Sequence, residues 1–215
     1  MPLPRPAPFG QVPAPAAPPA PTAPRRPRWN RIAGTTSGML VALTNLYLGG
    51  EVSVLGTLGT PTRSPSSPGA VEGWLWQVGG QGSLGFVSGT VCRGAGFCGT
   101  RGAGGLALKG GWGRGVPDRE GWTTPSLMLY AQLDLLAGYF AIPSAPLVAE
   151  VSSWEAVGRL RLGAHFGALG GAPAAPGGAP GAGRVTLNGA LLIEVVPVSR
   201  ASRGVSVGFL VGIAF

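Results

Sequence analysis

The final stretch of the chain, GVSVGFLVGIAF (residues 204–215), decides the fold, because large and small side chains alternate along it and it ends on an aromatic residue. One face of an extended strand would carry all the large apolar residues, namely Val205, Val207, Phe209, Val211, Ile213 and Phe215. The opposite face would carry a smaller set, Ser206, Gly208, Leu210, Gly212 and Ala214. This pattern is typical of a strand whose large face meets lipid and whose small face meets a crowded interior.

The composition also favours a membrane protein built from strands. Only 11% of the 215 residues are charged, against about a quarter in soluble domains. No window of about 18 consecutive apolar residues exists, so the sequence predicts no transmembrane helix. An apolar chain of this kind, rich in alternation, favours a β-barrel in a membrane. The net charge of +8 comes mostly from arginines scattered through tails and loops, a distribution that argues against nucleic-acid binding.

The same alternation runs through six earlier segments of the chain. These segments are 40–58, 71–86, 105–113, 126–141, 153–168 and 184–197. No charged residue lies on the apolar phase within their strand bodies, and Glu72, at the mouth of its strand, comes closest. The pattern therefore predicts an all-β fold, an antiparallel up-and-down transmembrane β-barrel. The strands of an antiparallel sandwich with one solvent-exposed face also alternate between apolar and polar residues. However, the solvent-exposed face of a sandwich would carry more charge than the polar phase of this chain does.

The number of strands depends on one hidden hairpin. Seven alternating segments are visible, and an even number of strands requires an eighth. The turn is expected either in LGGEV (48–52) or in VGGQGS (78–83). The second position is favoured, because it leaves PTRSPSSPGA (61–70) as a long loop opposite a short turn, the asymmetry of bacterial barrels.

Residues 1–35 are predicted to form a disordered Pro/Ala/Arg-rich arm, followed by the barrel domain at 36–215. Eleven of the first 30 residues are Pro, which has no backbone N–H and a fixed φ, so extended polyproline conformations are expected. The arm contains no apolar segment typical of a secretory signal. Since a transmembrane β-barrel of this kind would have to be exported, either a signal is missing from this sequence or the start codon is misassigned.

The final VSVGFLVGIAF (205–215) resembles the C-terminal strand of bacterial outer-membrane β-barrels, which ends in Phe after apolar residues at alternate positions. The resemblance implies a small eight-stranded barrel over 38–215, with an assembly signal made of Phe209, Val211, Ile213 and Phe215 that the barrel-assembly machinery reads. It also implies an outer-membrane location, a periplasmic arm, and contact with outer-membrane lipids including lipopolysaccharide. The oligomeric state stays open, with a monomer favoured.

Eight strands leave an interior just wide enough for side chains. The charges on the inward phase are therefore expected to fill it as an ionic network of Lys109, Asp134, Glu155, Arg159, Arg161 and Glu194. Unpaired guanidinium groups would be costly there, so Arg159 and Arg161 are expected to pair with Asp134, Glu155 or Glu194. The alternative places these arginines near the rim, in reach of water, and whether the lumen conducts stays open.

Few residues suggest chemistry. Cys92 and Cys98 frame the Gly-rich CRGAGFC and are predicted to form a loop disulfide, with free thiols as the alternative. His165, the only histidine, has no serine at a matching spacing, and a satisfied interior histidine is favoured. No catalytic residue, metal site or cofactor is predicted. The expected function is that of a non-enzymatic outer-membrane barrel with a structural or loop-mediated role; a lipid-modifying barrel enzyme and a soluble β-rich binding protein are the alternatives.

Overall fold

A computed structural model describes the chain over residues 26–42, 45–89, 96–118, 120–142, 151–169, 185–198 and 204–215. Eleven strands lie in these ranges: β1 (Arg28–Trp29), β2 (Ile32–Ala42), β3 (Asn45–Leu58), β4 (Thr62–Arg63), β5 (Val71–Gly89), β6 (Phe97–Gly115), β7 (Trp122–Thr123), β8 (Leu127–Ile142), β9 (Val151–Leu169), β10 (Val185–Val198) and β11 (Gly204–Ala214). Within this part of the chain no helix is long and apolar enough to cross a membrane.

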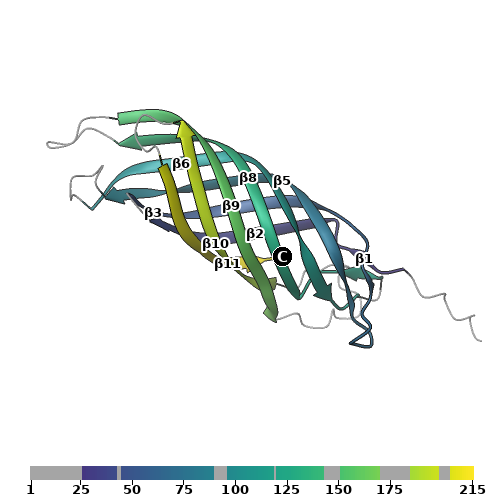
Figure 1. The fold of residues 1–215 in the computed structure, drawn as a ribbon. Coiled ribbons are helices and arrows are strands. Elements are labelled where there is room, and N and C mark those ends of the chain that lie inside the picture. The colour runs from purple at the N-terminus through teal and green to yellow at the C-terminus, as the bar shows by residue number, and fades with distance from the viewer. Residues whose placement is uncertain are drawn as a thin grey trace, which may run out of the picture.

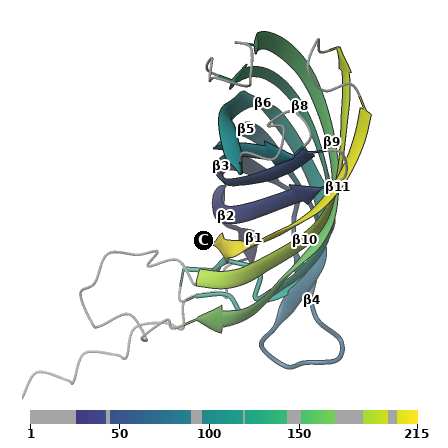
Figure 2. The same ribbon diagram turned by 90° about the vertical axis from the view of Figure 1, so that its left-hand side faces the viewer.

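Eight of these strands close into one antiparallel barrel (Figures 1 and 2). Each of β2, β3, β5, β6, β8, β9 and β10 pairs with the next barrel strand along the chain, and β11 pairs with β2 to close the circle. This confirms the prediction of an all-β, eight-stranded, up-and-down barrel. We call the end where β2 begins and β11 ends the terminal end, and the other end the opposite end.

The predicted hairpin positions are wrong, because β3 runs unbroken through 48–52 and β5 runs unbroken through 78–83. The eighth strand is β2, which pairs with β3 across residues 43–44. The paired glycines mark places where backbones approach closely, not turns. A Cβ added to Gly79 would lie 2.2 Å from the carbonyl oxygen of Val54 on the neighbouring strand.

The barrel also begins earlier in the chain than expected. Strand β2 starts at Ile32, so the predicted boundary between residues 35 and 36 falls inside it. Ahead of β2, the short strand β1 pairs in parallel with β7 at the terminal end. Residues 1–25 of the predicted arm lie outside the described residues.

The outer face of the barrel is apolar on seven of its eight strands and mixed on β2, where Ile32, Thr36 and Gly38 are exposed. Among the described residues, 32 large apolar side chains are exposed, and all seven alternating segments turn their apolar phase outward. Within the described part of the eight barrel strands, Glu72 and Arg114 are the only charged residues on the outward phase. They are register partners near the terminal end.

Exposed aromatic side chains gather near the two ends of the barrel strands. Trp74 and Trp76 on β5, Phe166 on β9 and Phe215 after β11 lie toward the terminal end. Toward the opposite end lie Phe86, Phe97, Tyr139 and Trp154. Phe209 is the exception among the described strands, because it lies in the middle of β11.

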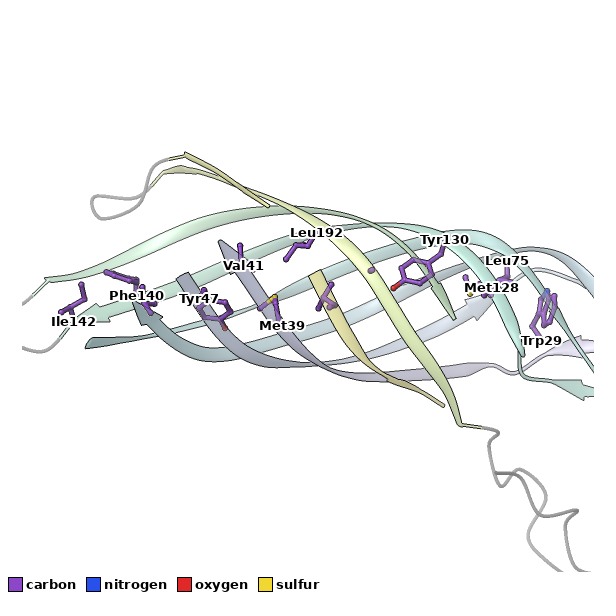
Figure 3. Packing of buried hydrophobic residues seen from close by; sticks show 13 residues of the cluster. Trp29, Met39, Val41, Tyr47, Leu75, Met128, Tyr130, Phe140, Ile142 and Leu192 are labelled. Carbon is purple, nitrogen blue, oxygen red and sulfur yellow. The ribbon is translucent and has the colours of Figure 1, made fainter. Parts of the chain in front are cut away.

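The interior combines apolar and polar packing. Thirteen buried apolar residues form one cluster along the barrel. Figure 3 shows Trp29, Met128 and Leu75 toward one end of the cluster and Phe140 and Ile142 toward the other. Buried polar side chains occupy the same interior, and they form the candidate site described below.

The barrel seam joins the first and last barrel strands. Phe215 and Gly34 exchange two backbone hydrogen bonds of 2.8 and 2.9 Å. The Phe215 ring covers Gly34 so closely that a Cβ at that position would lie 2.4 Å from the ring. Glycine at position 34 therefore leaves room for the terminal aromatic ring at the seam.

Candidate functional site in the barrel interior

Eight charged side chains are buried among the described residues, and their formal charges cancel. Four are bases and four are acids: Arg101, Lys109, Arg159 and Arg161 against Glu51, Asp134, Glu155 and Glu194. All eight lie on the inward phase of their strands, where alternation leaves them no route to the outer face. None is more than 7% exposed, so each needs a partner inside the barrel.

Register places the oppositely charged residues beside one another. Arg159 on β9 lies directly across from Glu194 on β10 and, on its other side, from Asp134 on β8. Arg161 is two residues further along the same face of β9 and lies across from Gln132. Because directly opposed residues on one face have Cβ atoms about 4.5–5.5 Å apart, these side chains are within reach of each other.

One half of the network is centred on Glu194. Its Oε2 accepts a hydrogen bond from Arg159 Nε at 2.7 Å, and its Oε1 accepts one from Arg101 Nη1 at 2.5 Å. Arg101 Nε in turn donates to Glu155 Oε2 at 2.7 Å. A single carboxylate thus connects arginines from β6 and β9, and Arg101 extends the ion pairs to Glu155.

The other half is centred on Arg161. Its Nη2 lies 2.6 Å from Asp134 Oδ2, and its Nη1 donates to Glu51 Oε1. Arg159 Nη1, at 4.0 Å from Glu51 Oε2, joins the two halves. The network therefore crosses the lumen from β3 to β8, β9, β10 and β6.

Amide and hydroxyl groups extend the network. Gln132 Nε2 donates to Asp134 Oδ1 at 2.7 Å and to Gln81 Oε1 at 2.9 Å. Ser83 accepts a hydrogen bond of 3.2 Å from Arg159 Nη1. These neutral partners use hydrogen-bonding capacity that the ion pairs leave over, which lowers the cost of burying the charges.

Lys109 stands apart from the ion pairs. It forms no salt bridge with any described residue; instead its Nζ lies 2.8 Å from His165 Nε2 and 3.9 Å from the centre of the Tyr130 ring. Tyr130 donates to Asn188 Oδ1 at 2.7 Å, and Asn188 donates to Ser37 Oγ at 3.2 Å. When Lys109 is charged it can only donate, and the facing His165 nitrogen then carries no proton.

The interior brings together most of the predicted site residues. Asp134, Glu155, Arg159, Arg161 and Glu194 belong to one network, while Lys109 contacts His165 in place of a carboxylate. Arg184, which the alternation in 184–197 also places on the inward phase, lies outside the described residues.

Arg101 is the residue that sequence reasoning missed. It lies in GTRGAGG (99–105), which reads as a flexible Gly-rich loop, but these residues belong to β6. Extending the inward phase of Lys109 and Ala107 backwards in steps of two reaches Arg101, so the signal was present in the sequence. Glu51 and Gln132 also lie on the inward phase of their segments, so the period-two alternation indicated their inward position as well.

The remaining predicted sites divide as follows. Phe209, Val211 and Phe215 are exposed on the outer face, and Ile213 is half-buried. Cys98 lies in β6, but residue 92 is outside the described residues, and the disulfide stays a prediction. Among the described residues no group of three or more His, Cys, Asp or Glu side chains is arranged to hold a metal ion.

Fold and interior together define the class of protein: an eight-stranded antiparallel barrel with an apolar outer face and a charge-paired interior. Comparison with known protein families, with curated proteins and with solved structures gave no match.

Proposed function

We propose that the chain is a non-enzymatic β-barrel of the bacterial outer membrane. Its filled interior makes it a closed barrel rather than a pore, with a structural role or a role carried by its loops. The observation that carries this proposal is the outer face, because most of the 32 large apolar side chains exposed among the described residues lie on the barrel strands. Soluble monomers rarely expose apolar patches of more than a few hundred Å².

The distribution of polar and aromatic residues on that face supports a membrane location. A charge at the middle of a lipid-facing strand costs about 2–4 kcal/mol, and the outward charges Glu72 and Arg114 lie near strand ends. The exposed aromatic residues near both strand ends correspond to the two girdles of membrane barrels. We therefore propose outer-membrane lipids, including lipopolysaccharide, as neighbours of the barrel.

The interior supports closure of the lumen. The guanidinium groups of Arg101, Arg159 and Arg161 bridge strands on different sides of the barrel, and Glu51 and Glu194 connect them. Breaking one such buried pair costs about 3–5 kcal/mol. At such a cost the opened network is rarely populated, so we expect no steady passage of hydrated ions.

The enzyme alternative finds little support. A hydrolytic site needs a serine within hydrogen-bonding reach of a histidine, and the described partners of the His165 ring are Lys109 and Tyr130. For the C-terminal strand we propose recognition by the barrel-assembly machinery, and we propose a monomer as the working state.

Planar-bilayer recording tests the proposed closure. The purified barrel is first shown to be inserted by flotation with urea-washed lipid vesicles, and the same vesicles are then fused with the bilayer. We expect no steady conductance step, whereas an open porin run in the same bilayer gives steps. Steady channels from inserted protein would overturn the closed-lumen proposal, and failure to float with the vesicles would overturn the membrane proposal.

A further inference from the structure

Residues 28–31 form a separate feature at the terminal end of the barrel. Strand β1 lies parallel to β7, where Arg28 N donates to Gly121 O at 2.8 Å and Asn30 N donates to Thr123 O at 2.9 Å. The Asn30 side chain adds a hydrogen bond to Thr124. The chain just ahead of the barrel is therefore held by backbone and side-chain bonds to the connection between β6 and β8.

The side chain of Trp29 points into the barrel. It is only 4% exposed and belongs to the same buried cluster as Leu75, Met128 and Tyr130. Figure 3 shows Trp29 at the end of this cluster, next to Met128 and Leu75. A tryptophan provides a large buried surface with little side-chain entropy to lose, so it suits the closing of an opening.

Two arginines hold the segment from outside. The guanidinium groups of Arg28 and Arg31 lie 5.9 and 5.5 Å from the centre of the Trp122 ring, within the range of cation–π attraction. The carbonyl oxygen of Arg31 accepts a hydrogen bond of 2.7 Å from Thr57 N on β3. The segment is thus attached both to the β6–β8 connection and to the barrel wall.

We infer that residues 28–31 are a stopper that seals the terminal end of the barrel interior, with Trp29 as its inserted side chain. Everything that enters the interior from this end must first displace Trp29. The stopper precedes the first barrel strand and lies at the end of the chain segment rich in Pro, Ala and Arg. Its release therefore opens this end while the closed ring of eight strands stays intact. The inference does not depend on the compartment in which the barrel resides.

Cysteine accessibility at Met128 tests the stopper. Met128 is 1% exposed and packs in the same cluster as Trp29, so Met128→Cys, with Cys92 and Cys98 replaced by serine, reports access from the terminal end. A membrane-impermeant maleimide is added to the folded protein in detergent micelles. We expect labelling to become at least about tenfold faster in Trp29→Ala and in a chain that begins at residue 32, because local opening sets the labelling rate.

Two controls make the result specific. A chain that begins at residue 26 loses only residues ahead of the stopper and should label as slowly as the full chain. Phe140→Cys reports on the other end of the cluster, where the side chain is also 1% exposed, and its labelling should not change in the stopper variants. Unchanged labelling at Met128→Cys, or equal acceleration at both cysteines, would overturn the inference. If the chain beginning at residue 32 does not fold, Trp29→Ala decides.

Discussion

At the scale of single residues, the character of the outer face can be tested at Leu133. This side chain is 47% exposed in the middle of β8. If it faces lipid, Leu133→Arg should destabilise the inserted barrel by about 2–4 kcal/mol. The measurement is the urea midpoint for unfolding from lipid vesicles.

Val116 provides a matched control for this substitution. It is equally exposed at 47% but lies in the connection after β6, outside the barrel strands. We expect Val116→Arg to leave the urea midpoint nearly unchanged. Equal effects of the two substitutions would show that the outer face of β8 does not meet lipid.

Glu194 is the residue on which the interior network depends most. It is 2% exposed and accepts hydrogen bonds from both Arg101 and Arg159. Glu194→Ala leaves two guanidinium groups without this partner, so we expect a loss of about 3–5 kcal/mol in the free energy of unfolding. Glu72 is the control: it is a half-buried carboxylate near a strand end that accepts one hydrogen bond from Ser64. We expect Glu72→Ala to lower the free energy of unfolding by well under half as much as Glu194→Ala. A small effect of Glu194→Ala would mean that water replaces the missing carboxylate and that the interior is hydrated.

The inward positions of these charges follow from period two alone, but their partners do not. Asp134 lies directly across from Arg159, yet its carboxylate contacts Arg161, two residues further along the strand. That choice depends on the register and on Glu194 already occupying Arg159 from the other side. Register between these neighbouring strands depends on the turns that join them, and the contact of Arg161 with Glu51 on β3 depends on closure of the ring, which no single segment of sequence encodes.

At the scale of elements, the β11–β2 seam closes the barrel and depends on Phe215. Deleting Phe215 removes the two backbone hydrogen bonds to Gly34 and the ring that covers this glycine. We expect less assembled barrel in the membranes of an expressing Gram-negative host, measured by quantitative immunoblot of urea-washed membranes. Phe215→Tyr keeps the backbone and the ring and should assemble normally, so an unchanged yield after deletion would contradict a role of Phe215 in assembly.

Strand β2 shows why pattern analysis found seven strands and missed the eighth. Its outward positions include Thr36 and Gly38, so the large-to-small contrast that identifies the other strands is weak here. The glycine pairs within β3 and β5 looked like turns, but they lie where neighbouring backbones come close. Local sequence encodes the side-chain phase of a strand more clearly than its ends.

At the scale of the whole molecule, two rules disagree about orientation. The connections at the terminal end, 59–70, 116–126 and 170–184, are longer than those at the opposite end, 43–44, 90–96, 143–150 and 199–203. Bacterial barrels usually place the shorter turns on the periplasmic side, which would put the termini outside. However, two of the long connections contain the short strands β4 and β7, which pair with β5 and β1. These connections are therefore part of the structure at the terminal end, and their length does not by itself indicate the extracellular side.

We expect the arm to be periplasmic, because the resemblance of the C-terminal strand to those of outer-membrane barrels implies it. The chain is expressed behind a cleavable export signal with an epitope tag ahead of residue 1, and intact cells are treated with proteinase K. The tag should survive in intact cells and disappear once the outer membrane is permeabilised. Loss of the tag from intact cells would reverse the orientation.

The most direct test is to fractionate Gram-negative cells that express the chain behind an export signal, and then to run the fractions by electrophoresis in SDS with and without heating. A membrane barrel closed by eight strands should appear in the outer-membrane fraction, resist extraction by urea, and migrate differently before and after boiling. Recovery of the folded chain in the soluble fraction, or one mobility under both conditions, would contradict the claim that the apolar outer face of this barrel meets lipid.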